Sequence, residues 1–202
     1  EKALAVAQMD DGSIYLAGFA NPGPIGNTDA TLTKLDENGN LIWQKFYGTS
    51  EHDYCNKMIL TPAGNFVLAG ETHYSTPNHV DAFLLKVDSS GSEQWFRHYG
   101  DSTQSESFND VILTEDGGFA SCGFVTGEVG TGNDFYIVKT DATGAATWSK
   151  NYGSERNDVA AALRQNSDGN FVVTGDKQKP DNSYNVYLLS LIHISEPTRP
   201  ST

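Results

Sequence analysis

Basic residues are scarce in this chain of 202 residues, which has 13 Lys and Arg against 26 Asp and Glu and a formal net charge of −13. Because the phosphates of DNA and RNA are bound by clustered Lys and Arg, this composition argues against a nucleic-acid-binding protein. No apolar run approaches the ~18 residues that a membrane-spanning helix needs, so no membrane span is expected. No signal peptide opens the sequence at Glu1, and we expect the natural chain to begin earlier.

An internal repeat organises the rest of the chain. The pattern K-x-D-x-x-G-x-x-x-W occurs three times, and Tyr-Gly follows each tryptophan at the same distance. Its tryptophans are Trp43, Trp95 and Trp148. A second pattern, G-x-[apolar]-x-x-x-G, occurs four times and closes on Gly18, Gly70, Gly123 and Gly175. The closing glycines lie 52, 53 and 52 residues apart, which indicates a repeat architecture.

Each period predicts four short β-strands. In the second period the first three cover Lys57–Leu60, Phe66–Ala69 and Phe83–Val87, and the fourth carries Trp95. Asp-Gly pairs such as Asp11-Gly12 separate the first strand from the second and are typical of tight hairpins. Four antiparallel strands in about 50 residues, without helical periodicity, predict a β-propeller blade. A β-solenoid with shorter rungs is the alternative.

The second period, GTSEHDYCNKMILTPAGNFVLAGET followed by DAFLLKVDSSGSEQWFRHYG, resembles the propeller-type repeats of secreted bacterial proteins, the seven-bladed β-propeller repeat family. Its tryptophan hairpin is more distantly similar to quinoprotein-like blades. The resemblance covers about residues 1–189 and implies an all-β propeller fragment, an open arc of just under four blades, but no particular activity. The blades are expected over 1–49, 50–102, 103–155 and, incomplete, 156–188. Further blades are expected in the same parent chain.

The repeat stops at Leu189, where the register predicts a further K-x-D-x-x-G-x-x-x-W. The segment LSLIHISEPTRP instead resembles the translated end of a transposon-type sequencing adapter. We therefore interpret residues 189–202 as a non-native tail and give His193 and Glu196 no functional weight. A short capping strand followed by a Pro-rich tail is the alternative.

No motif for catalysis occurs within the repeats, such as H-E-x-x-H, C-x-x-C or G-x-S-x-G. Cys55 and Cys122 align with small or apolar residues of other periods, so we expect buried packing residues. The histidines do not recur between periods, and no metal site is expected from them, although His73 and His79 share one segment. The recurrent tryptophans are expected to pack between blades.

Acidic residues recur at two positions of the repeat, one before the third strand and one at the start of the turn that follows it. Asp29, Asp81 and Asp134 precede the third strand, with Asn185 as the fourth member. Their expected role is to accept backbone N–H groups; calcium coordination is the alternative, and no other cofactor is expected. The acids that begin the turn after the third strand are expected to act likewise, and the lysines two residues earlier to be solvated or paired with them. These residues are Asp36, Asp88 and Asp141, preceded by Lys34, Lys86 and Lys139.

Antiparallel blades place their connections at two ends. The turns between first and second and between third and fourth strands share one end. The remaining connections share the other, which we call the variable end because its segments differ between periods. These segments include residues 21–27, 51–53, 71–80, 128–133 and 177–184. Variable loops on a rigid scaffold often carry function. The binding surface is therefore expected on Glu51, Asp53, Glu71, His73 and Tyr74.

The favoured hypothesis is a non-catalytic binding or scaffold module of a secreted or cell-surface bacterial propeller protein, with a protein or glycan as partner. The alternative is a fragment of a propeller enzyme, either a quinoprotein-like oxidoreductase or a glycan-active enzyme. That alternative needs polar groups on the first strands, which would line the channel. The candidates are Asn56, Asn109, Asp110 and Arg164. An intracellular scaffold is a third hypothesis.

Overall fold

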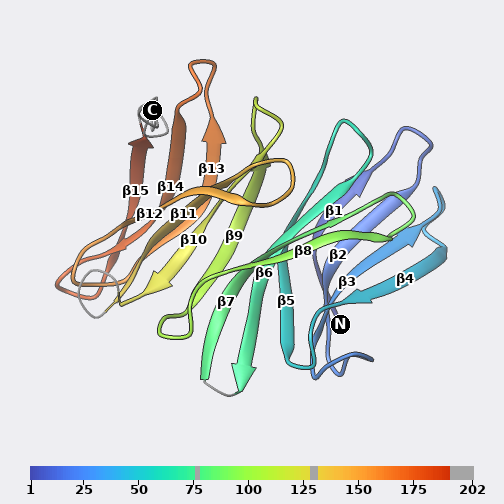
Figure 1. The fold of residues 1–202 in the computed structure, drawn as a ribbon, viewed down its shortest axis with the longest axis horizontal. Helices are drawn as coiled ribbons and strands as arrows, with labels where there is room; N and C mark the ends of the chain where they lie inside the picture. The colour runs from blue at the N-terminus through green and yellow to red at the C-terminus, as the bar shows by residue number, and fades with distance from the viewer. Residues whose placement is uncertain (76–77, 128–131, 192–202) are drawn as a thin grey trace, which may run out of the picture. The chain divides into compact units, whose positions relative to one another are not determined.

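The computed structural model confirms an all-β protein (Figure 1). It describes residues 1–75, 78–127 and 132–191, and this part of the chain holds fifteen strands and no helix. No helix long and apolar enough to cross a membrane is therefore found in these residues. Part of the predicted 128–133 segment and residues 192–202 of the predicted tail lie outside the described residues, whereas residues 189–191 of that tail belong to a strand.

The strands form antiparallel sheets in which each strand pairs with its neighbour in the chain. The first sheet consists of β1 (Lys2–Gln8), β2 (Ile14–Ala20), β3 (Asp29–Leu35) and β4 (Leu41–Tyr47). The second consists of β5 (His52–Leu60), β6 (Phe66–Ser75), β7 (Asn78–Val87) and β8 (Glu93–Tyr99). The third consists of β9 (Glu106–Leu113), β10 (Phe119–Thr126), β11 (Asn133–Thr140) and β12 (Ala146–Tyr152). The fourth has three strands, β13 (Asp158–Gln165), β14 (Phe171–Gln178) and β15 (Tyr184–Leu191).

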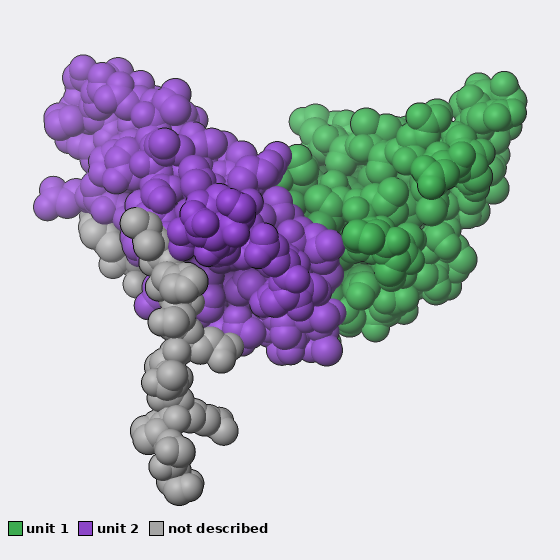
Figure 2. Space-filling model, turned by 90° about the horizontal axis from the view of Figure 1, so that it is seen from above, with its two compact units in different colours: residues 1–111 green, residues 112–202 purple. Residues whose placement is uncertain are grey.

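These sheets are the predicted blades, three of four strands and one of three. No strand pairing among the described residues joins β15 to β1, so the array is not closed by a shared sheet. The chain divides into two compact units, residues 1–111 and 112–202 (Figure 2).

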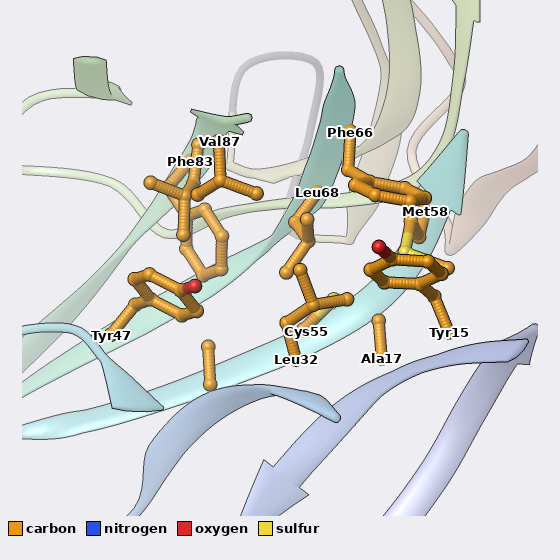
Figure 3. Close-up of a cluster of buried hydrophobic side chains, with 12 residues drawn as sticks. Tyr15, Ala17, Leu32, Tyr47, Cys55, Met58, Phe66, Leu68, Phe83 and Val87 are labelled. Carbon is orange, nitrogen blue, oxygen red and sulfur yellow. The ribbon is translucent and has the colours of Figure 1, made fainter. Parts of the chain in front are cut away.

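Unit 1 is held together by an apolar cluster between its first and second sheets. Tyr15 and Leu32 come from the first sheet, and Phe66, Leu68 and Phe83 from the second (Figure 3). These five side chains are fully buried, and burying each one contributes on the order of 1.5–3 kcal/mol. Unit 2 has an equivalent cluster between its sheets, which includes Ile137, Leu163 and Val173.

Two of the three recurrent tryptophans, Trp43 and Trp148, pack between blades as predicted. The Trp43 ring stands edge-on to Tyr15, with centroids 5.9 Å apart, and packs against the unit 1 cluster. Trp148 of β12 contacts Phe171 of β14 edge-on at 5.8 Å, which joins neighbouring sheets of unit 2. The turn after β7 lies over Trp43, because a Cβ on Gly91 would lie 2.9 Å from its ring. In unit 1 the turn glycine of the second blade thus packs on the tryptophan of the first blade.

The closing glycines accommodate a β-bulge that the sequence does not reveal. Between Cys55 and Lys57 the register of β5 shifts by one residue, and Gly70 of β6 lies opposite Cys55. A Cβ on Gly70 would collide with the carbonyl oxygen of Tyr54. Gly18 and Gly175 meet the backbone of their own first strands in the same way. The bulge therefore explains why this repeat position is glycine.

The acids of the turns after the third strands have the predicted structural role. The Asp36 carboxylate accepts the N–H groups of Asn38 and Asn40 at 2.9 and 2.8 Å, and Asp88 and Asp141 accept the equivalent bonds. Hydrogen bonds within the turn lower the pKa of all three carboxyl groups.

Two of the lysines that precede these acids have other contacts than predicted. Buried Lys139 donates to the carboxylate of Asp116 at 2.7 Å, and not to Asp141. The ammonium group of Lys34 lies over the ring of Tyr15, 5.2 Å from its centroid. The expectation that the lysine is solvated or paired with the turn acid is therefore wrong for Lys139, which is buried and bound to the acid of another turn.

Cys55 and Cys122 are free and fully buried, which confirms their predicted role as packing residues. Burial raises the pKa of the Cys55 thiol to about 12, so it stays protonated at neutral pH.

Candidate functional site at the variable end

The variable end of the second blade is more regular than predicted. Residues 71–80 were expected to form an irregular connection, but β6 continues to Ser75 and β7 begins at Asn78. The pairing holds in register, with Glu71 opposite Ala82 and His73 opposite Val80. The predicted site residues Glu71, His73 and Tyr74 therefore lie on a strand of an extended hairpin (Figure 1). A strand fixes their directions more firmly than a loop would.

Glu71 and His73 belong to a half-exposed group that we call the Tyr54 cluster, made of Phe19, His52, Tyr54, Glu71 and His73. The His73 Nε2 lies 2.8 Å from Glu71 Oε1, and the His73 ring meets Tyr54 edge-on at 5.0 Å. Phe19 meets Tyr54 edge-on at 4.9 Å, and His52 stacks on it at 6.2 Å. The His73 side chain is 43% exposed, so its imidazole is within reach of a partner.

Tyr74 belongs to a second group, which includes Thr72, His79, Asp81 and His98. The rings of Tyr74 and His79 stack with centroids 4.6 Å apart, and His79 Nε2 lies 3.4 Å from Asp81 Oδ1. Desolvation raises the pKa of the Asp81 carboxyl, although His79 and His98 oppose it. Desolvation lowers the pKa of His98, which favours the neutral ring at neutral pH.

Asp53 does not lie on a variable surface segment, and that prediction is wrong. Its side chain is fully buried on β5, and its carboxylate accepts bonds from the backbone N–H of Thr49 at 2.7 Å and from the hydroxyl of Thr72 at 2.5 Å. Burial raises the pKa of this carboxyl against those hydrogen bonds. Glu51 precedes β5, and its carbonyl oxygen accepts the N–H of Asn27 at 3.1 Å. The structure thus brings Glu71 and His73 together but assigns Asp53 to the interior.

The acids before the third strands differ from one another. Asp29 accepts the N–H groups of Ile25 and Gly26 at 2.7 and 2.8 Å, which confirms its predicted role in the turn. Asp81 pairs with His79, as described above. Asp134 is fully buried, and a Cβ on Gly153 would collide with its carboxylate. Within the described ranges, no three His, Cys, Asp or Glu side chains gather in a way that could hold a metal ion.

Asn56, Asp110 and Arg164, three of the four polar residues proposed for the channel, make structural contacts. Asn56 is the extra residue of the β5 bulge and donates to the carbonyl of Phe108 at 3.1 Å. Asp110 lies 3.4 Å from the Lys57 ammonium, and Arg164 donates to the carbonyl of Leu163.

Unit 2 contains a cavity that the sequence did not reveal. We call it the Asp158 cavity; its volume is about 160 Å³, and its walls include Phe135, Tyr152, Asp158, Lys177 and Tyr187. One signal in the sequence could have pointed to it. The position of Asp53, three residues before the extra residue of the β5 bulge, is acidic in every period, and its counterparts are Glu1, Glu106 and Asp158.

Comparison with known proteins supports the fold and leaves the activity open. No known family profile matches the chain. The chain is 24% identical over 206 residues to the regulatory protein FlaEY of Caulobacter vibrioides, covering 83% of the chain and 21% of that protein. The chain thus spans about a fifth of the length of this curated relative.

Two solved structures match at 14% identity, and the first of them is similar in fold. A protein of unknown function from Dyadobacter fermentans has a TM-score of 0.58, with 92% of this chain and 59% of that chain covered. A GH43 endo-arabinanase from Bacillus licheniformis has a TM-score of 0.48, with 95% and 72% covered.

Proposed function

We propose that this chain is a non-catalytic binding module of a secreted or cell-surface β-propeller protein, and that its partner docks on the Tyr54 cluster. The observation that carries the proposal is the half-exposed Glu71–His73 pair set against the Tyr54 ring. An acceptor, an imidazole and an aromatic edge on two paired strands, β5 and β6, can recognise a polar surface such as a protein or a glycan. The resemblance of the repeats to those of secreted bacterial proteins supports the location.

The surroundings of the Thr72 hydroxyl, close to the Tyr54 cluster, support a binding function over nucleophilic catalysis. Thr72 lies between Asp53 and His98, with its oxygen 2.5 Å from Asp53 Oδ1 and 3.2 Å from His98 Nε2. This hydroxyl is fully buried and bonded to a carboxylate, so a substrate cannot reach it. The name of the curated relative, a regulatory protein, is also in keeping with recognition. The alternative hypothesis, a propeller enzyme, is distinguished from this proposal by the test below.

The proposal is tested by screening the full chain on glycan and peptide arrays and measuring the affinity of each ligand found. We expect His73→Ala and Glu71→Gln to weaken binding by about tenfold or more, since each removes a polar contact and leaves its partner unmatched. Asn38→Ala, in an exposed turn at the opposite end of the first blade, is the control and leaves affinity unchanged.

Two results would overturn the proposal. One is equal binding by the His73→Ala variant and the wild type. The other is chemical conversion of a bound glycan, or reduction of a redox dye, by the purified chain.

A further inference from the structure

A separate site lies in unit 2, where a buried carboxylate faces the Asp158 cavity. The Asp158 side chain is 3% exposed, and neither of its oxygens has a hydrogen-bond donor within the described part of the chain. The ammonium group of Lys177 lies 3.9 Å from Oδ2, beyond hydrogen-bond distance. A buried acceptor without donors is costly, so this carboxylate has a strong preference for a group that brings N–H or O–H donors.

Aromatic rings form the other walls of the cavity. Phe135 and Tyr187 stand at 75° to each other with centroids 5.9 Å apart, and Tyr152 also lines the space. Phe135 can approach because β14 has Gly175 at this point, where a Cβ would lie 2.8 Å from its ring. The Lys177 ammonium lies over Tyr187, 5.1 Å from the ring centroid. The chain's own cation thus already occupies the space between carboxylate and ring.

We propose that the Asp158 cavity binds a guanidinium group, such as an arginine side chain. A guanidinium is planar, offers paired N–H donors that match both oxygens of a carboxylate, and stacks on aromatic rings. The cavity volume of about 160 Å³ is well below the ~300–1,000 Å³ of sites for drug-sized ligands, so it suits one small group.

Lys177 acts in this proposal as an internal competitor. It lies directly opposite Asp158 across the β13–β14 pair, and its side chain is 38% exposed. Because it makes no hydrogen bond to Asp158, it can move into solvent when a better donor arrives. A quaternary ammonium fits the rings but brings no N–H donor to the carboxylate. A neutral sugar would instead use Lys177 as a donor.

The test is calorimetric titration of the full chain with Nα-acetylarginine amide. Asp158→Asn keeps the shape of the side chain but removes its charge, and it lowers affinity by about tenfold or more. Lys177→Gln removes the competitor and raises affinity several-fold. Asp181→Asn changes an exposed turn acid of the same unit and leaves affinity unchanged. Should Asp158→Asn fail to fold, Tyr187→Leu removes the ring from an exposed strand position and lowers affinity as well.

Further arms separate the ligand classes. If free arginine binds as tightly as the acetylated amide, the guanidinium group alone is recognised. If free arginine binds more weakly, the cavity prefers an arginine side chain within a peptide. Both results support the proposal. No binding of either compound, tighter binding of choline or glucose, or a weaker complex with Lys177→Gln overturns it.

Discussion

Asp53 in unit 1 and Asp158 in unit 2 occupy the same repeat position and have opposite surroundings. Asp53 lies directly opposite Thr72, whose hydroxyl donates to it, and Thr49 donates from the preceding turn. Asp158 lies directly opposite Lys177, whose ammonium group stays 3.9 Å from the carboxylate and makes no hydrogen bond to it. One cross-strand residue therefore decides whether this acid joins two segments or lines a cavity. Repeats can vary function at such a position without altering the backbone.

The largest expected difference comes from removing each acid. Asp53→Ala leaves the N–H of Thr49 without its acceptor, removes the bond from the Thr72 hydroxyl, and lowers the free energy of unfolding by about 2–3 kcal/mol. Asp158→Ala removes an acceptor that has no hydrogen bond to lose, and costs less than about 0.5 kcal/mol. Urea unfolding of both variants measures the two values. Equal losses would show that the two sites do not differ energetically.

A smaller effect is expected from moving the unit 1 arrangement into unit 2. Lys177→Thr places a hydroxyl opposite Asp158, as Thr72 lies opposite Asp53. The new hydrogen bond raises the free energy of unfolding by about 1 kcal/mol. The control is Lys150→Thr on an exposed position of β12, which makes the same change in strand propensity without an acid opposite it. A gain no larger than that of the control would contradict the comparison.

The smallest effect concerns the turn acids, which are alike in both units. Because the pKa values of Asp36, Asp88 and Asp141 are lowered on folding, their stabilisation is present above the unfolded value of 3.8 and is lost as the pH falls below it. The raised pKa of Asp53 acts in the opposite direction, since its protonation on acidification relieves the cost of the buried charge. Thermal melts between pH 7 and pH 3 should show the gap between wild type and the triple Asp→Asn turn variant narrowing at the acid end. A constant gap would argue against this assignment.

The turn ends of the blades could be predicted from sequence, and the variable ends could not. Asp-x-x-Gly specifies its own turn, because the carboxylate binds the next N–H groups and the glycine at position 39 takes φ near +84°. The length of β6 depends on its pairing with β7. Residues 71–75 do not alternate strictly between apolar and polar residues, so their sequence does not predict a strand. Sequence thus located the hairpin but not its regularity.

The burial of acidic side chains was the second feature that could not be predicted from the sequence. Asp53 stands between His52 and Tyr54 in an acidic stretch that is typical of an exposed loop, yet it is fully buried. Its donors come from Thr49 and from Thr72, which lies on another strand, and that partnership exists only after β5 and β6 pair. The Tyr54 cluster has the same origin, since Phe19 and His73 meet Tyr54 from different strands.

The pairing of every strand with its neighbour in the chain also bears on how the protein forms. A hairpin closes within about 1–10 μs, and folds dominated by local contacts assemble faster than those that need distant segments to meet. Each blade can therefore take shape soon after its own residues have left the ribosome. The later joining of blades through the tryptophan contacts would then be the slower, cooperative step, and the order of synthesis would become the order of assembly.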